Sequence, residues 1–253
     1  MIRVLTILLC LVTVASAMVG VFNPAGMGVA GFCPTQVPGI RLWLDAGRSG
    51  LDVGTSVSTW GDFSGSGIHA VQGTPAAKPT IQVGAGGRNV VRFDGVDDYI
   101  QTANFGPAIS VPLTIFLVWK STSFPSGAHV IMANSSANNF GFHNDGTSVR
   151  RAYLMNGGVV DTYAVSTNDY CIMDLLWNGT GSSFRTNNSA VISASGVGTV
   201  DSTLEGLVLG RTDTAYNWPG DLAEVIVYDR TLTEPEHASV ARYLGTKYAI
   251  ITK

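Results

Sequence analysis

The sequence predicts an all-β fold, an antiparallel sandwich of many strands with one short helix near its C-terminal end. Residues 89–102 alternate polar and apolar side chains, and the pair Asp94-Gly95 interrupts the alternation. This pattern is typical of two antiparallel strands joined by a tight turn. Residues 113–119 form a continuous apolar run rich in β-branched and aromatic side chains, which indicates a strand buried on both faces. Asn- and Gly-rich segments separate the remaining runs, as expected for short strands.

The composition favours an extracellular β protein and argues against binding of nucleic acid. With 253 residues, the chain is within the size of one large β-sandwich. Charged residues make up 13% of the chain, against roughly 25% in typical soluble proteins. The net charge is −3 and the 15 basic residues are scattered, so no basic surface for nucleic acid is predicted.

The first 38 residues differ from the rest. Residues 1–17 have a basic start, a short apolar run and small residues at the end, which is typical of a secretory signal peptide. The apolar run is shorter than the ~20 residues of a stable membrane span. Residues 18–38 are uncharged and interrupted by Gly and Pro, so they form either a linker or an assembly arm that would bind through Phe22 and Phe32. The sandwich would then occupy residues 39–253, with its apolar faces beginning at Ile40.

The strands of the sandwich follow in order. In the first, Ile40, Leu42 and Leu44 share one face. A glycine-rich loop over residues 60–67 follows, in which the carboxylate of Asp62 can accept backbone hydrogen bonds. After the central runs described above, strands recur at the spacing of a sandwich. The further predicted strands are 69–72, 79–83, 129–133, 140–143, 150–155, 159–165 and 169–177.

One helix is predicted near the C-terminal end. Thr233 and Glu236 have the spacing of a capping box, in which the glutamate reaches back to the N–H of the capping residue. Apolar side chains then recur on one helix face, at Val240, Tyr243, Leu244, Lys247 and Tyr248, where the stem of the lysine counts as apolar. We expect this helix to pack on the sandwich.

Several motifs, taken in order, resemble one family. The motifs are "LWLDA", "WGDFSGSGIHAVQ", "VVRFDGVDDYIQT", "LVLGRT", "WPGDLAEVIVYDRTLTEPE" and "ARYLGTKYAI". This series resembles the laminin-G-like branch of the concanavalin A-like lectin/glucanase superfamily over residues 39–250. The resemblance implies a jelly-roll β-sandwich. It leaves the function open, because this fold occurs in lectins, hydrolases, adhesion modules and structural proteins.

The residues favour a non-catalytic protein. A retaining glycosidase needs two carboxylates about 5 Å apart, and in this superfamily they would come from one strand. Glu205 and Glu224 have no acidic partner at a same-face position, and Glu234 and Glu236 begin the predicted helix. The four histidines are dispersed, and no nucleophile motif or phosphate-binding loop is present.

Two sets of residues remain as candidate sites. The resemblance implies Ca²⁺ at loop aspartates, for which Asp97 and Asp98 are the candidates, although such aspartates also brace β corners. Sugar binding would use an exposed aromatic ring beside polar groups, as Tyr216, Trp218 and Asp145 could supply, although packing of Trp218 in the core or at its rim is the favoured alternative. Beyond the possible Ca²⁺, no cofactor is predicted. Cys33 and Cys171 are expected to be buried free thiols, and a disulfide between them is the alternative.

The sequence therefore predicts a structural or binding module with two possible roles. In the first, the chain is a surface component of an assembly, such as a phage virion decoration or fibre protein, and its N-terminal arm binds protein partners. In the second, it is a secreted or cell-surface carbohydrate-binding or adhesion module that recognises surface glycans. The uncharged arm favours the first role and the leader-like segment favours the second.

Overall fold

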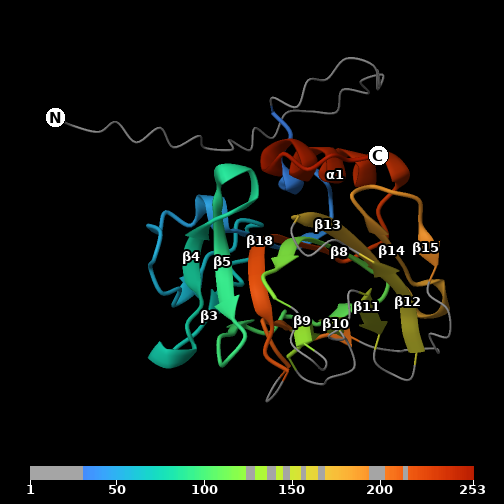
Figure 1. Cartoon of the computed structure of the whole chain (residues 1–253). Helices are drawn as coiled ribbons and strands as arrows, with labels where there is room; N and C mark the ends of the chain where they lie inside the picture. The colour runs from blue at the N-terminus through green and yellow to red at the C-terminus, as the bar shows by residue number, and fades with distance from the viewer. Residues whose placement is uncertain are drawn as a thin grey trace.

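The computed structural model describes residues 31–123, 129–135, 141–144, 149–154, 158–164, 169–193, 203–212 and 216–253. The fold is an antiparallel β-sandwich with one C-terminal helix, as the sequence predicts (Figure 1). No helix in these ranges is long and apolar enough to span a membrane.

The first sheet, here called sheet A, contains eight strands. Its hydrogen-bonded order is β15-β14-β13-β8-β18-β5-β4, with β1 also paired to β18. The strands of sheet A are β1 (Ile40–Asp45), β4 (Thr80–Val83), β5 (Asn89–Asp94), β8 (Leu113–Ser121), β13 (Cys171–Trp177), β14 (Ser183–Thr186), β15 (Ile192–Ser193) and β18 (Pro219–Tyr228).

The second sheet, sheet B, also contains eight strands, in the order β12-β11-β10-β9-β17-β6-β3-β2. A separate short pair is made by β7 (Ile109–Ser110) and β16 (Thr203–Leu204). The strands of sheet B are β2 (Thr59–Trp60), β3 (Ala70–Val71), β6 (Ile100–Thr102), β9 (His129–Asn134), β10 (Gly141–Asn144), β11 (Val149–Leu154), β12 (Gly158–Ala164) and β17 (Leu207–Leu209).

Sheet A is covered on both faces. Side chains from one face of β8, such as Ile115 and Leu117, belong to the core between the two sheets. Side chains from the opposite face, such as Phe116 and Val118, belong to a second core beneath the helix. This confirms that the apolar run 113–119 is a strand buried on both faces, because successive side chains point to opposite sides.

The helix α1 (Glu234–Tyr248) lies over the outer face of sheet A (Figure 1). The predicted capping box is present, since Glu236 Oε2 accepts the backbone N–H of Thr233 at 2.9 Å. Val240, Leu244 and Tyr248 are buried against the sheet, as their spacing predicts. The helix therefore seals the second core.

The N-terminal segment differs from expectation in one respect. Cys33 and Val37 are buried in the core beneath the helix, and Tyr228 Oη donates to the Pro34 carbonyl at 3.1 Å. The expectation that the core begins at Ile40 is therefore wrong, because it already includes Cys33, Pro34 and Val37. Ile40 itself packs with this outer core rather than with Leu42 and Leu44, because the register of β1 shifts after it. The division of the preceding residues into leader and arm stays a prediction.

The two described cysteines, Cys33 and Cys171, are both buried free thiols. Cys171 belongs to the core between the sheets, whereas Cys33 lies in the core on the other face of sheet A. A disulfide between them is therefore absent, and the prediction of buried free thiols is confirmed.

Candidate functional site

An open cleft of about 570 Å³ lies on the outer face of sheet B, over β3 and β6. Its lining comes from two chain segments and consists of Gly67, His69, Val71, Gln72, Gly73, Thr74, Tyr99, Gln101, Thr102 and Ala103. A depression of this size is within the range of small-molecule binding sites. The cleft is therefore the first candidate for ligand binding.

Strand alternation explains why these side chains reach the outer face. Trp60, Ala70 and Ile100 pack in the core between the sheets. Their neighbours Val71 and Gln101 point the opposite way and lie directly across from each other in the β3–β6 register. Val71 is 51% exposed, which is unusual for an apolar strand residue flanked by other strands. An exposed valine beside a glutamine gives the floor of the cleft a mixed apolar and polar character.

The polar groups of the cleft divide into fixed and available ones. The Gln72 amide donates to the Tyr99 carbonyl at 3.0 Å and accepts the Thr74 N–H at 2.9 Å, so it holds the cleft together. His69 Nδ1 accepts the backbone N–H of Asp62 at 2.9 Å, which places the ring proton on Nε2. The imidazole is thus fixed as an N–H donor. The Gln101 amide makes no side-chain hydrogen bond to the described residues.

An aromatic ring completes the lining. Tyr99 follows the corner between β5 and β6, and the guanidinium carbon of Arg211 lies 3.4 Å from the centre of its ring. This stacking fixes the orientation of the tyrosine ring, because a cation over an aromatic face is held by the ring's quadrupole. None of the ten lining residues is acidic or a lysine.

The two aromatic candidates for sugar binding, Tyr216 and Trp218, lie in different environments. Trp218 is fully buried against Phe93 and Trp119, and its Nε1 donates to Ser121 Oγ at 2.9 Å. The ring cannot stack on a ligand, so its assignment to a sugar site is wrong and the core-packing alternative holds. Tyr216 is 55% exposed but does not line the cleft. Asp145 and the arm residue Phe22 lie outside the described residues.

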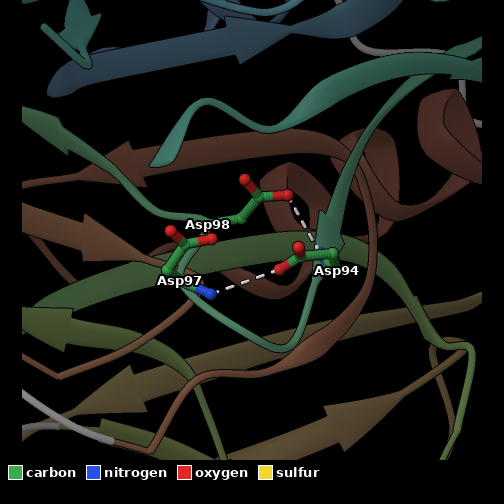
Figure 2. Close-up of side chains that lie close together, drawn as sticks. All are labelled: Asp94, Asp97 and Asp98. Atoms are coloured by element: carbon green, nitrogen blue, oxygen red, sulfur yellow. Dashed lines mark hydrogen bonds between the residues drawn. The ribbon is translucent and has the colours of Figure 1, made fainter. Parts of the chain in front are cut away.

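The acidic corner between β5 and β6 is ordered by its own carboxylates (Figure 2). Asp98 is buried and its Oδ2 accepts the Asp94 N–H at 3.0 Å, while Asp94 Oδ1 accepts the N–H groups of Val96 and Asp97 at 2.7 and 3.3 Å. Burial is the main reason that the pKa of Asp98 is raised to about 6, and the charges of Asp94 and Asp97 add to it. Asp98 therefore braces the corner.

The same corner has a donor set that fits a hard cation. One carboxylate oxygen from each of Asp94, Asp97 and Asp98 lies within 4.8 Å of the others. Calcium–oxygen bonds are about 2.3–2.6 Å long, so two ligand oxygens on opposite sides of a Ca²⁺ ion are separated by about twice that length, which is close to 4.8 Å. Three carboxylates supply fewer than the six to eight oxygens that Ca²⁺ prefers. The Ca²⁺ assignment to Asp97 and Asp98 stays a prediction.

A third cluster was missed by the sequence analysis. Glu224, in the middle of β18, is directly opposite Asp45 in the β1–β18 register. Lys247 from the helix bridges them, with Nζ 2.5 Å from Asp45 Oδ2 and 2.6 Å from Glu224 Oε2. Both carboxylates are fully buried. A search for acidic pairs within one strand could not find this pair, because its members come from neighbouring strands.

A comparison with protein families agrees with the β-sandwich fold. A model of the concanavalin A-like lectin/glucanases superfamily matches residues 94–236. No curated protein sequence matches the chain significantly.

Solved structures share the fold at low sequence identity. One is a Trypanosoma rangeli sialidase in complex with sialic acid, with a TM-score of 0.60 and 14% identity over 86% of this chain and 34% of the sialidase. The chain thus spans about a third of that enzyme. A second is the binding domain of Paraclostridial Mosquitocidal Protein 1, with a TM-score of 0.59 and 12% identity over 85% of this chain and 53% of that one. A third is domain 4 of AbnA, an extracellular arabinanase from Geobacillus stearothermophilus, in complex with arabinotriose, with a TM-score of 0.55 and 11% identity over 80% of this chain and 98% of that domain.

Proposed function

We propose that this chain, which belongs to the concanavalin A-like lectin/glucanases superfamily, is a non-catalytic glycan-binding module of an extracellular protein. The observation that carries the proposal is the open cleft on sheet B, which combines one aromatic ring with uncharged hydrogen-bonding groups. Sugars present apolar C–H faces and many hydroxyls, so an aromatic side chain beside amide and imidazole groups matches their chemistry.

Three side chains would make the contacts. Tyr99 would pack against the apolar face of a sugar ring through the ring face that Arg211 does not cover. His69 would donate from Nε2, and Gln101 would both donate and accept. Two of the similar structures were solved with a sugar bound, sialic acid in one and arabinotriose in the other. At 14% and 11% identity they share the fold with this chain, and they support the proposal of a glycan ligand without naming a sugar.

The proposal is tested by blocking the cleft without disturbing the fold. Purified full-length protein is screened on a glycan array that includes arabinan and sialylated oligosaccharides, and hits are measured by titration calorimetry. Val71→Arg places a long charged side chain over the cleft and should weaken binding at least tenfold. Val83→Arg on β4 is the matched control, since Val83 is similarly exposed at 58% but lies on sheet A. If both variants bind the glycan with the affinity of the wild type, the glycan site does not lie in this cleft.

The non-catalytic part of the proposal rests on where the carboxylates lie. The cleft lining contains none, and Asp45 and Glu224 are fully buried beneath α1. Two-carboxylate glycoside hydrolysis needs both groups in contact with the substrate. Purified protein should therefore release no reducing sugar from arabinan, β-glucan or sialylated glycans. Release that a single acidic substitution abolishes would overturn this part.

The alternative role in an assembly, as a virion decoration or fibre protein, rests on residues 18–38. Phe32 packs on the domain, where its ring centre lies 5.8 Å from that of Tyr243, so it is less available to a partner than expected. Phe22 lies outside the described residues. No contact in the described part of the chain favours this role over glycan binding.

A further inference from the structure

The cluster of Asp45, Glu224 and Lys247 joins three elements that are far apart in the sequence. Asp45 ends β1, Glu224 lies in the middle of β18, and Lys247 is in the last turn of α1. The lysine nitrogen is within 2.6 Å of an oxygen of each acid. Both carboxylates are fully buried, and the lysine side chain is 11% exposed.

Aromatic side chains surround the cluster. Glu224 Oε1 accepts from Trp43 Nε1 at 2.6 Å and from Tyr243 Oη at 3.1 Å, and its Oε2 accepts from Tyr248 Oη at 2.7 Å. The rings of Tyr243 and Tyr248 have their centres 5.3 and 5.0 Å from Lys247 Nζ. Asp45 has fewer partners: Oδ1 accepts the Gly47 N–H at 3.0 Å, and Oδ2 contacts the lysine. Glu224 is therefore held firmly, whereas within the described part of the chain Asp45 Oδ2 contacts only the Lys247 amine.

The identity of the cation distinguishes this cluster from the other ion pairs. The carboxylates of Asp221, Asp229, Glu234 and Glu236 are paired with arginines, and that of Asp174 with His237. A guanidinium keeps its proton and is a poor nucleophile, whereas a lysine amine becomes a nucleophile when a neighbouring base takes its proton. Among the described residues, Lys247 is the lysine that forms an ion pair, and it contacts two carboxylates at once.

We propose that Lys247 and Asp45 become joined by an intramolecular amide bond, with Glu224 as the proton-transferring catalytic residue. A proton first moves within the cluster, so that the amine and the Asp45 carboxyl group are both neutral. Lys247 Nζ then attacks Cγ of Asp45, and Glu224 takes a proton from the nitrogen of the tetrahedral intermediate. Glu224 returns this proton to the departing Oδ2, which leaves as water. One N–C bond forms and one C–O bond breaks, and no oxidant, reductant or co-reactant is needed.

The charge balance of the cluster supports the reaction. Two carboxylates and one ammonium place three charges in a buried site, which is unfavourable because charges lose hydration there. Burial and the nearby charge of Asp45 raise the pKa of Glu224, which suits a group that alternately takes and gives a proton. Amide formation replaces the Asp45–Lys247 pair with a neutral group, and exclusion of water opposes the reverse hydrolysis. The inference does not depend on the glycan site.

The bond would tie the first strand of the domain to its last helix. Asp45 and Lys247 are 202 residues apart in sequence, so the crosslink would enclose nearly the whole sandwich. A covalent link of this kind restricts the unfolded chain in the same way as a disulfide. It would stabilise a domain whose two described cysteines remain free.

Mass spectrometry of the full chain tests the proposal directly. The intact mass should be lower than the sequence mass by one water molecule, after allowing for the determined N-terminus. Trypsin should yield residues 42–48 joined to residues 243–253, because cleavage after an acylated Lys247 is blocked. Recovery of the unlinked peptides 42–48 and 243–247 in full yield would overturn the proposal and leave the cluster as an ion pair.

Variants separate the roles of the three residues. Lys247→Arg keeps the positive charge, so it should fold, show the full sequence mass and have a lower Tm than wild type. Glu224→Gln should also keep its full mass, and circular dichroism checks that it is folded. Asp45→Asn should still crosslink but lose one ammonia molecule in place of water. Loss of water in folded Glu224→Gln would overturn the role of Glu224. If the wild type and the Asp45→Asn variant both have their full sequence mass, no amide bond forms in either protein and the proposal is overturned.

Discussion

Asp98 accepts a hydrogen bond from the backbone N–H of Asp94, four residues earlier, at 3.0 Å. Together with the two hydrogen bonds that Asp94 Oδ1 accepts, this contact closes the corner between β5 and β6, and the corner places Tyr99 at the start of the cleft. Asp97, between them, is partly exposed, and its carboxylate accepts no hydrogen bond from the described residues; Figure 2 shows a dashed line only at its backbone nitrogen. The two adjacent aspartates therefore have different roles, one as a brace and one on the surface.

Replacement of Asp98 by alanine should destabilise the domain by roughly 1–3 kcal/mol, because the Asp94 N–H loses its acceptor near the core. Chemical denaturation measures the change. Asp97→Ala is the matched control and should change the free energy of unfolding by less than about 0.5 kcal/mol, as is usual for surface substitutions. If both variants unfold like the wild type, the corner is not braced by Asp98.

The stability of the domain should depend on pH through Asp98. The folded-state pKa of about 6 is above the value of about 3.9 in an unfolded chain. The folded state therefore binds this proton more tightly, and the contribution of Asp98 becomes more favourable as the pH falls from 7 through 6 towards 4. Other acids act in the opposite direction, such as Glu236, whose pKa is lowered to about 2 mainly by Arg230.

The comparison of two proteins isolates this contribution. Asp98→Asn keeps an oxygen that can accept the Asp94 N–H but cannot titrate. At pH 7 the variant should have a higher Tm than wild type, and this difference in Tm should shrink as the pH approaches 4. A difference that stays constant over this range would show that Asp98 titrates normally.

Calcium should stabilise the corner if the three carboxylates bind it. Their spacing fits the ion, but they supply only part of its coordination shell, so we expect weak binding in the millimolar range, as in extracellular modules. Addition of about 5 mM Ca²⁺ should raise the Tm of wild type more than Mg²⁺ does. Asp97→Ala should lose this response, since it removes a ligand and leaves the brace intact. An unchanged wild-type Tm would mean that the corner is a brace only.

Local patterns predicted the fold well because they depend on neighbouring residues. The apolar run 113–119 predicts a strand buried on both faces, and the spacing of Thr233 and Glu236 predicts the start of a helix. The register shift in β1 could not be predicted, because it depends on how Ile40 and Leu42 pair with β18. For the same reason, nothing in residues 33–37 alone shows that they pack under the helix.

The candidate sites depend on contacts between distant segments, and the sequence predicted them less well. The cleft combines His69 and Val71 with Tyr99 and Gln101, which meet only through the pairing of β3 with β6. Trp218 lies in a segment with the composition of an exposed loop, but it directly precedes β18 and its side chain packs in the core. Asp45 and Glu224 meet across two strands. In each case strand pairing, and not local composition, determines the neighbours.

The final prediction concerns the N-terminal boundary of the domain. Deletion of residues 1–30 should leave a domain that unfolds cooperatively at the wild-type Tm, since the described core begins at residue 33. Deletion of residues 1–38 should lower the Tm markedly. It removes Cys33 and Val37 from the core, where a fully buried apolar side chain contributes about 1.5–3 kcal/mol. It also removes the carbonyls that accept from Tyr228 and Arg230.

Calorimetry of the two truncated chains beside wild type checks this boundary. Tyr228→Phe in the full chain is a control for the Pro34 contact alone, and it should cost about 1 kcal/mol, because it removes one hydrogen bond and no apolar surface. The longer deletion should cost more than this variant, since it also opens the core beneath α1. If the chains beginning at residues 31 and 39 have the same Tm, residues 33–38 contribute nothing to stability. The sandwich would then begin at Ile40, and the whole of residues 18–38 would be free to act as an assembly arm.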